Sequence, residues 1–378
     1  MTEKVKQQHM FSNKMIAGIL IPVVLEQLLN SIMGTADTMM VSNIGSAAIS
    51  AVSLVDSINI LVIQAFSALA AGGAIVCSQY IGQQNKKMAN ESARQVLFII
   101  TAISIAVSVL CLGFKKPLLR LIFGSVEADV MRASETYFFY TAISFPFIAA
   151  YDSAASIFRA QENTKGPMLI SMISNAMNIV GNAIMIWIFH MGVAGAAIST
   201  LVSRIFCAVV VLIQLRKDRQ PIVVRDYLKI RPDWAMIRRI LGIGIPSGVE
   251  NSMFQLGKII VLSLVSTFGT YAIAANAVSN AIGLFQILPG MAITLAITPV
   301  ISRCVGAGDY EQAKYYNKKL MLITYVSMTA MVLFIFSLLP FILNAYNLSD
   351  LTAKTTADII HFHGIGAIFI WPVAFSLP

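Results

Sequence analysis

Long apolar segments alternate with short polar breaks along the whole chain, beginning with the stretch from Met15 to Val41. A helix needs about 20 mainly apolar residues to cross a bilayer, and ten segments of this kind follow one another. Their length and unbroken apolar character predict helices rather than strands. The predicted spans cover residues 15–41, 53–80, 95–114, 133–153, 167–190, 194–215, 240–266, 280–305, 320–343 and 357–378.

Composition agrees with this interpretation. Of the 378 residues, 57% are hydrophobic and 12% are charged, and the mean hydropathy is +0.76. Water-soluble domains carry about 25% charged residues. The sequence therefore predicts an all-α polytopic membrane protein.

Basic residues gather on one side of the predicted membrane. Of the 27 Lys and Arg residues, 20 lie on the face that holds the N-terminus and 5 on the opposite face, while Arg204 and Lys258 lie within helices. Cytoplasmic loops carry the excess of Lys and Arg, so we expect a cytoplasmic N-terminus. The formal net charge of +9 then reflects membrane topology, and no nucleic-acid partner is expected.

The second half of the chain repeats the first. A shift of 224 aligns IPVVLE (21–26) with IPSGVE (245–250) without a gap, and positions 21–89 contain 16 identities in 69. Chance would give about five in so apolar a composition. The first copy has six predicted helices, an even number, so the second begins on the same side and the repeats are parallel.

The repeat predicts an N-terminal lobe over residues 1–215, a basic cytoplasmic loop over 216–239 and a C-terminal lobe over 240–378. The second copy has four predicted helices, because Pro372 near the end of the chain aligns with Pro146 in the fourth helix of the first copy. We therefore expect a twelve-helix architecture of which this chain carries about ten, with a C-terminal truncation.

Ionisable side chains inside apolar helices are functional candidates, because a charge at the bilayer centre costs about 2.5–3.5 kcal/mol. In the first predicted helix, Glu26 and Asp37 are eleven residues apart, which places them within about 20° of one face. Asn30 lies near the same stripe. Asp37 is the leading candidate for binding a coupling cation.

The helix over 167–190 carries Asn178 and Asn182 one turn apart, and the next helix opens with small residues that lead to Thr200. A carboxylate, two carboxamides and a hydroxyl would form an oxygen-rich pocket for a proton or Na⁺. We predict a cation-coupling site of Asp37, Asn178, Asn182, Thr200 and Asn30, with Na⁺ as an alternative occupant at the first three. A competing interpretation is that the amides merely join neighbouring helices.

Other polar residues are secondary candidates. Glu26 and its repeat mate Glu250 lie near the cytoplasmic ends of their helices, where an interfacial role competes with transport. Lys258 is expected to have a pairing partner, since an isolated ammonium there would tend to lose its proton. Asp152 lies near the cytoplasmic end of the fourth predicted helix, and Asp56 is interpreted as an interfacial residue.

No motif predicts catalysis. The chain has no glycine-rich phosphate loop followed by Lys and Ser or Thr, and no nucleophile motif. Its four cysteines are scattered singly, without disulfide or metal spacing. The sequence thus predicts no enzyme and no cofactor, with H⁺ or Na⁺ as the coupling ion.

Several segments together resemble the multidrug and toxic compound extrusion (MATE) transporters. The likeness is strongest for the bacterial branch related to the DNA-damage-inducible protein F and covers essentially the whole chain. The segments that carry it are GTADTMMVSNIG (34–45), FRAQENTKGPM (158–168), NIVGNAIMIWIFHMGVAGAAIST (178–200) and the IP…G…A pattern that opens the second half.

The resemblance implies an antiporter of the bacterial cytoplasmic membrane that exports amphipathic, often cationic, drugs or metabolites in exchange for H⁺ or Na⁺. By motif match, Asp37 resembles the family's cation-coupling aspartate, and Asn178, Asn182 and Thr200 match its partners. Several relatives carry Asp where this chain has Asn182, and one carboxylate fewer favours a proton over Na⁺. Phe254 stands where some members have an acid, which argues against a cation site in the C-terminal lobe.

Other functions compete with this reading. A flippase of the same superfamily for lipid-linked precursors would need a cationic cleft, whereas Arg204 and Lys258 are the basic residues within the predicted helices. A receptor or channel subunit fits the parallel repeat poorly, and an inactive truncated transporter is a further alternative. We expect amphipathic small molecules and the lipid bilayer as partners, and a monomer, since two fused repeats already build a pseudo-symmetric cleft.

Overall fold

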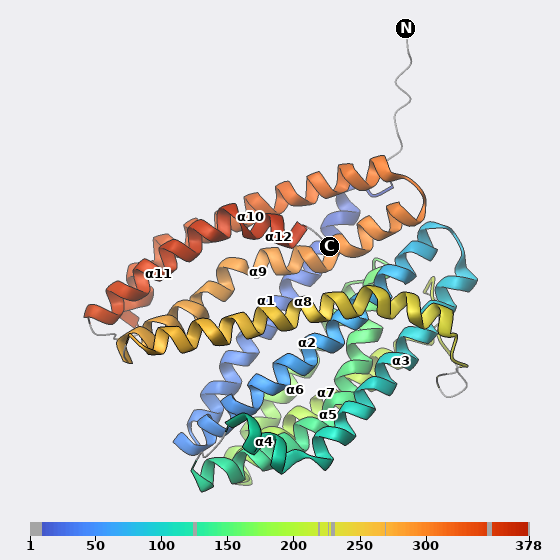
Figure 1. Cartoon of the computed structure of the whole chain (residues 1–378). Helices are drawn as coiled ribbons and strands as arrows, with labels where there is room; N and C mark the ends of the chain where they lie inside the picture. The colour runs from blue at the N-terminus through green and yellow to red at the C-terminus, as the bar shows by residue number, and fades with distance from the viewer. Residues whose placement is uncertain are drawn as a thin grey trace. The chain divides into compact units, whose positions relative to one another are not determined.

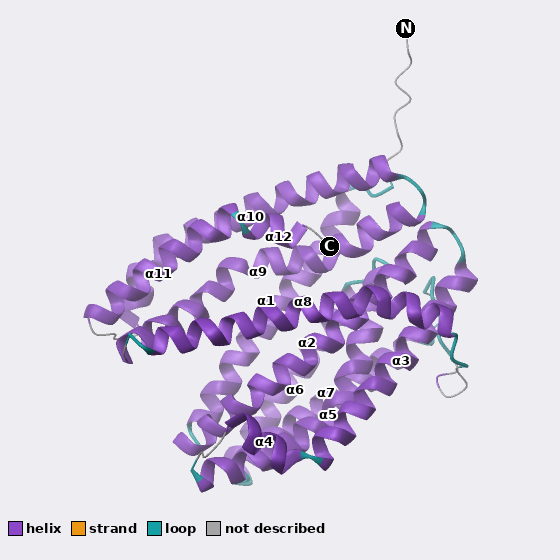
Figure 2. Cartoon of the chain, in the orientation of Figure 1, coloured by secondary structure: helices purple, strands orange, loops and turns teal. Residues whose placement is uncertain are grey.

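The computed structural model describes residues 10–123, 127–217, 220–225, 227, 231–268, 270–345 and 350–376. Within these ranges the chain forms helices and no strand (Figures 1 and 2). Seven of the described helices are long and apolar enough to cross a membrane by length and composition. The all-α membrane fold is confirmed, while the count of ten spans stays a prediction.

The helices follow the predicted segments and extend beyond most of them. In chain order they are α1 (Asn13–Ser42), α2 (Ser46–Gly82), α3 (Lys86–Gly113), α4 (Lys115–Phe123), α5 (Ala128–Ala160), α6 (Lys165–Ala183), η1 (Ile184–Ile188), α7 (Gly192–Leu215), α8 (Trp234–Ser266), α9 (Thr270–Gly306), α10 (Tyr310–Ala345), α11 (Asp350–Phe369) and α12 (Trp371–Ser376). Three features were not predicted: the short helix α4, the π-helical turn η1 that ends α6, and a break between α11 and α12 at Ile370.

Helix boundaries preserve the internal repeat. The shift of 224 that aligns the two sequence copies carries Ser46–Gly82 of α2 onto Thr270–Gly306 of α9, and it carries the last residue of α1, Ser42, onto the last residue of α8, Ser266. Since both ends of α2 and α9 coincide, the two copies keep the same helix lengths although most of their residues differ.

The chain divides into two compact units. The N unit comprises Leu28–Ser252, and the C unit comprises the described residues of Met1–Gln27 and Met253–Pro378. Helices α1 and α8 therefore each begin in one unit and end in the other. The lobe boundaries predicted at residues 215 and 240 were drawn from the repeat, and they stay a prediction.

Helix α5 occupies the centre of the N unit, where it packs against α2, α3 and α7 (Figure 1). Its buried face is built from small and aromatic residues, among them Phe138, Phe145 and Phe158. The ring of Phe145 meets Phe66 of α2 edge to face, with 6.2 Å between ring centroids. Burying large rings against alanine and serine brings the helices close enough for polar side chains to bond across them.

In the C unit, α9 packs against α10, α11 and α12. The chain entering α1 is attached to this bundle through Tyr316, whose hydroxyl accepts a hydrogen bond from the Phe11 amide at 2.7 Å and donates one to the Phe11 carbonyl at 2.8 Å. Phe11, Ile16 and Ile19 then join a buried cluster with residues of α9 and α10.

The basic loop after α7 is packed onto the N unit in its described part. Ile222 and Val224 are fully buried, and the Ile222 amide donates to Gln161 Oε1 at 2.9 Å. The Tyr227 hydroxyl donates to the Leu212 carbonyl at 2.7 Å, and burial raises the pKa of Tyr227 to about 12. The described part of this basic loop is thus held in place by buried side chains and hydrogen bonds to the N unit.

A close helix crossing in the N unit gives a first prediction. A Cβ atom on Gly72 of α2 would lie 2.7 Å from the Gly244 backbone nitrogen of α8, whereas one on Gly242 would meet nothing within 4 Å. Gly72→Ala should therefore destabilise the protein by about 1–3 kcal/mol through overpacking. Gly242→Ala should be neutral or stabilising by up to about 1 kcal/mol, because alanine favours a helix.

The measurement is the thermal midpoint in detergent, followed with a thiol-reactive dye. This readout suits the chain because its four cysteines are free and buried, so they react on unfolding. Equal midpoints for the two variants would contradict the close crossing of α2 and α8.

Candidate polar site in the N unit

The carboxylate of Asp37 meets the amide of Asn182 inside the N unit. Asn182 Nδ2 donates to Asp37 Oδ1 at 2.6 Å and lies 3.2 Å from Asn178 Oδ1. Asn178 Nδ2 donates in turn to Thr200 Oγ1 at 3.2 Å. Four residues predicted to share a site therefore lie in one chain of hydrogen bonds across α1, α6 and α7.

Both asparagines are buried, with Asn178 0% and Asn182 1% exposed, because α6 and α7 approach closely beside them. The Ser199 hydroxyl donates to the Asn178 carbonyl at 2.9 Å. Gly181 faces the same hydroxyl, so that any side chain at this position would overlap with Ser199. The small residues that open α7 thus place Thr200 within reach of Asn178.

Asn30 lies in a different group. Its Oδ1 accepts from Ser171 Oγ at 3.0 Å and from Asn175 Nδ2 at 2.9 Å. It is two helical turns from Asp37, about 10 Å along the axis. Asn30 thus joins α1 to α6 at a separate point, and its predicted place in the cation-coupling site stays a prediction.

A second polar cluster, which the sequence interpretation missed, surrounds Asp56 of α2. Asn59 Nδ2 donates to Asp56 Oδ1 at 3.1 Å, and the Tyr137 hydroxyl of α5 hydrogen-bonds to the same carboxylate. The charge of Arg204 on α7 interacts with those of Asp56, Asp37 and Asp152. Asp56 was interpreted as snorkelling or interfacial, which stays a prediction, but its bonds to Asn59 and Tyr137 were not predicted.

Arg204 connects the helices of this cluster. Its Nη1 donates to Ser144 Oγ of α5 at 2.7 Å. One sequence signal for the cluster existed, because Asp56 and Asn59 are three residues apart and share a helical face. The pairing with α5 and α7 could not be read from that spacing, since it depends on how the three helices pack.

The remaining predicted residues are dispersed. Asp152 accepts from Ser67 Oγ at 2.7 Å within the N unit. Glu26 is buried, at 3% exposure, whereas Glu250 is exposed. Lys258 lies over the ring of Phe254, with its Nζ 4.8 Å from the ring centroid, and no carboxylate in the described chain lies within 4.0 Å of that nitrogen. The partner of Lys258 in the described chain is therefore an aromatic ring.

The metal-binding potential of the site is limited. Among the residues that the structure describes, no three His, Cys, Asp or Glu side chains gather as metal ligands. A Na⁺ ion at Asp37 would thus need the neutral oxygens of Asn178, Asn182 and Thr200. The Oδ1 atom of Asn182 is buried and has no hydrogen-bond partner in the described chain, so an unused acceptor is present.

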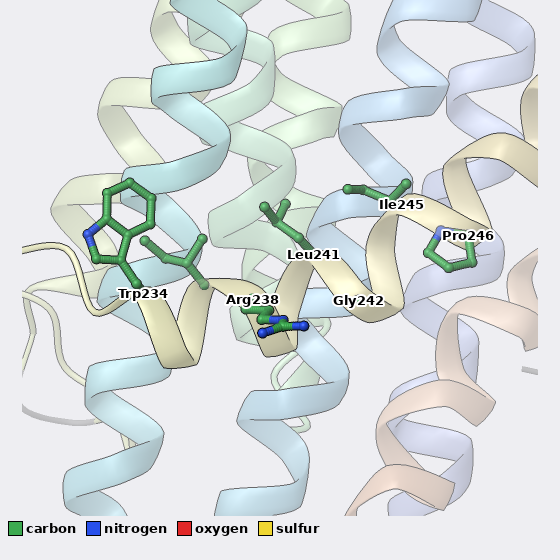
Figure 3. Close-up of a pocket in the computed structure, with 7 residues that line it drawn as sticks. Trp234, Arg238, Leu241, Gly242, Ile245 and Pro246 are labelled. Atoms are coloured by element: carbon green, nitrogen blue, oxygen red, sulfur yellow. The ribbon is translucent and has the colours of Figure 1, made fainter.

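A separate hollow runs along the first half of α8 (Figure 3). Its lining is apolar apart from Arg238, and Trp234, Leu241, Ile245 and Pro246 form most of it. None of the polar residues around Asp37 or Asp56 reaches this hollow. The polar site therefore lies among the helices and not in this surface depression.

The fold and the polar interior define a multi-pass helical membrane protein with an internal repeat. The MatE family model matches residues 22–184 and 246–375, well over half of the sequence, and the chain belongs to the MatE family. The two matched segments begin 224 positions apart (246 minus 22), as the repeat requires. Members of this family are transporters rather than enzymes, and the resemblance seen in the sequence is confirmed.

Individual relatives agree. The chain is 28% identical over 298 residues to the uncharacterized transporter YisQ of Bacillus subtilis, a match that covers 77% of this chain and 64% of YisQ. It is 24% identical over 351 residues to the probable multidrug resistance protein YoeA of the same organism, covering 90% of this chain and 74% of YoeA. A crystal structure of MATE in complex with MaL6 matches with a TM-score of 0.88 at 20% identity, over 96% of this chain and 81% of that one.

The position of Arg204 generates a second prediction. Arg204→Gln removes the donor to Ser144 and the positive charge near Asp56, and a hydrogen bond to a charged group contributes about 1.5–3 kcal/mol. The thermal midpoint should fall by several degrees. Arg132→Gln should leave the midpoint unchanged, because Arg132 pairs with Asp129 at the surface with its side chain 78% exposed.

A double variant tests the electrostatic part of this effect. If Arg204 stabilises the Asp56 carboxylate, Arg204→Gln should cost less in an Asp56→Asn background than in the wild-type chain. Strictly additive shifts in midpoint would show that the two side chains do not interact.

Proposed function

We propose that this protein is a secondary active efflux antiporter in which one proton on Asp37 is exchanged for an amphipathic compound. The observation that carries the proposal is the bond from Asn182 Nδ2 to Asp37 Oδ1 at 2.6 Å, in a group of otherwise neutral amides and a hydroxyl. Such partners adapt to either protonation state of the carboxyl group, which a rigid ion pair with Asp37 would not allow.

The donors and acceptors of the site support a reversible change. When Asp37 is ionised it only accepts hydrogen bonds, and Asn182 presents its NH₂ group. When Asp37 is protonated it donates, and rotation of the Asn182 amide brings the unpartnered Oδ1 atom to face it. Asn178 and Thr200 can reverse in the same sense, because a carboxamide and a hydroxyl each both donate and accept.

A proton suits this site better than Na⁺ for a reason of ligand chemistry. Na⁺ binding favours several oxygen ligands with negative charge among them, and Asn182 replaces the second carboxylate that several resembled relatives carry. The positive charge of Arg204 also acts on Asp37. It opposes the binding of either cation, so it does not decide between H⁺ and Na⁺. Na⁺ at Asp37, Asn178 and Asn182 stays the alternative.

We further propose that the protein lies in the bacterial cytoplasmic membrane as a monomer with its N-terminus in the cytoplasm. The support is the sequence distribution of Lys and Arg, of which 20 of 27 lie on the N-terminal face. Two fused repeats provide both halves of a transport pathway within one chain.

The third prediction tests Asp37 directly. Asp37→Asn should abolish proton-driven export from proteoliposomes, because an amide cannot bind or release the coupling proton. Export of ethidium and of dansylglycine under an imposed pH gradient is the measurement. Asp129→Asn is the matched control, since the Asp129 side chain is 76% exposed and outside the site. Coupled export by the Asp37→Asn variant at the wild-type rate would overturn the proposal.

The fourth prediction concerns ion choice. Asn182→Asp adds a second carboxylate beside Asp37, so a Na⁺ gradient should drive export in this variant while the wild-type chain responds mainly to a pH gradient. Asn175→Asp is the control, because Asn175 bonds to Asn30 and lies outside the Asp37 chain of bonds. Export by wild type under a Na⁺ gradient alone would favour the Na⁺ alternative, and facilitated flux without any gradient dependence would favour a flippase.

A further inference from the structure

A second group of polar side chains lies in the C unit, away from Asp37. His363 Nδ1 of α11 is 2.6 Å from Gln286 Oε1 of α9, and the charge of Lys258 on α8 interacts with His363. The Lys258 nitrogen also lies over the Phe254 ring. A lysine of α8 and a histidine of α11 therefore interact electrostatically, and an amide of α9 bonds to the histidine.

Aromatic side chains form one wall of this region. The Phe254 and Trp371 rings meet edge to face with centroids 5.6 Å apart, and Trp371 stacks on Phe375 at 5.3 Å. Glycines make room for the group, because a Cβ on Gly283 would lie 3.1 Å from His363 Cε1 and one on Gly290 would overlap with the Phe375 ring.

The internal repeat shows what has changed here. The shift of 224 places Lys258 where the first copy has Gly34, and Asn280 where it has Asp56. The shift of 226 that relates α5 to α11 places His363 where the first copy has Tyr137. The C unit thus lacks the acid of its N-unit counterpart and has gained two bases at equivalent positions.

Gln286 and Lys258 carry hydrogen-bond donors for which the described chain supplies no oxygen acceptor. Gln286 is fully buried, and its Nε2 has no hydrogen-bond partner in the described chain. Lys258 has no carboxylate within ion-pairing distance among the described residues, as noted above. An ammonium and the unpartnered Gln286 amide group near stacked rings would complement a ligand that supplies both an anion and an aromatic ring.

We propose that the C unit binds the exported compound through an acidic group, a carboxylate held by the Lys258 ammonium near His363, with its aromatic part against Phe254 and Trp371. This inference rests on the proposed export function and specifies its substrate class as aromatic carboxylates. It departs from the sequence-based expectation of cationic substrates. The Phe254 ring serves both partners, since it stabilises the Lys258 ammonium and offers an apolar edge to the ligand.

The test is a binding measurement that needs no ion gradient. Trp371 is one of three tryptophans, so in a Trp187→Phe/Trp234→Phe chain in detergent Trp371 is the sole tryptophan donor for energy transfer to a bound dansyl group. Dansylglycine carries a carboxylate and dansylcadaverine an ammonium on the same fluorophore. We expect dansylglycine to bind at least about tenfold more tightly than dansylcadaverine, as one charge-assisted hydrogen bond would give.

Lys258→Gln should weaken dansylglycine binding about tenfold or more, and Lys258→Arg should restore most of it. Lys354→Gln is the matched control, because Lys354 is an exposed lysine of α11 in the same unit. Unchanged dansylglycine affinity in Lys258→Gln, or preference for dansylcadaverine, would overturn the inference. Thermal midpoints of all variants separate loss of the site from loss of the fold.

The two proposals fail in different ways. Asp37→Asn should bind dansylglycine with wild-type affinity while losing coupled export. Binding that is preserved with no export by the wild-type chain would refute the antiporter and keep the carboxylate site. Export of ethidium without dansylglycine binding would keep the antiporter and refute the carboxylate site.

Discussion

A membrane-spanning helix has no water in the hydrocarbon core to satisfy its polar side chains, and the N unit is organised by that constraint. Asp37 would be costly without a partner, and α6 supplies one through Asn182. The amides then need further partners, which Thr200 of α7 provides at 3.2 Å from Asn178. One carboxylate thus determines side chains on three helices, and it requires the small residues that allow α6 and α7 to approach.

The two copies of the repeat differ in the polar residues at equivalent positions of their helices. Their helices coincide residue for residue where α2 corresponds to α9, so the backbone was retained while the interior changed. Asp56 faces Tyr137 in the first copy, whereas Asn280 and His363 occupy the corresponding positions in the second. Each unit has its own buried clusters, which allows one interior to change charge without disturbing the packing of the other.

Sequence periodicity was sufficient for the helices and for part of the site. Segment length and the repeat located the predicted spans on helices, although the span 357–378 is divided between α11 and α12, and the spacing of Asn178 and Asn182 placed both on one face. Contacts between side chains on different helices were harder to predict. Residue spacing shows which side chains share one face of a helix, but it does not show which neighbouring helix that face contacts. Asp56 near Arg204, and His363 beside Gln286, therefore became visible only in the structure. The π-helical end of α6 and the break at Ile370 depend on packing and left no periodic signal.

Helices α1 and α8 link the chemistry of each unit to the other unit's core. The first turns of α1 are packed in the C unit around Phe11 and Tyr316, while Asp37 near its other end bonds within the N unit. Pro22, which lies between them, removes one backbone hydrogen bond and so lowers the cost of bending there. If α1 exchanges between a straight and a bent form, a proton on Asp37 can shift that equilibrium only when its affinity for the two forms differs. In the proposed antiporter, the adaptable amides around Asp37 would provide that difference, since each protonation state would fix a different pattern of bonds at one end of a helix whose other end is held by the C-unit core.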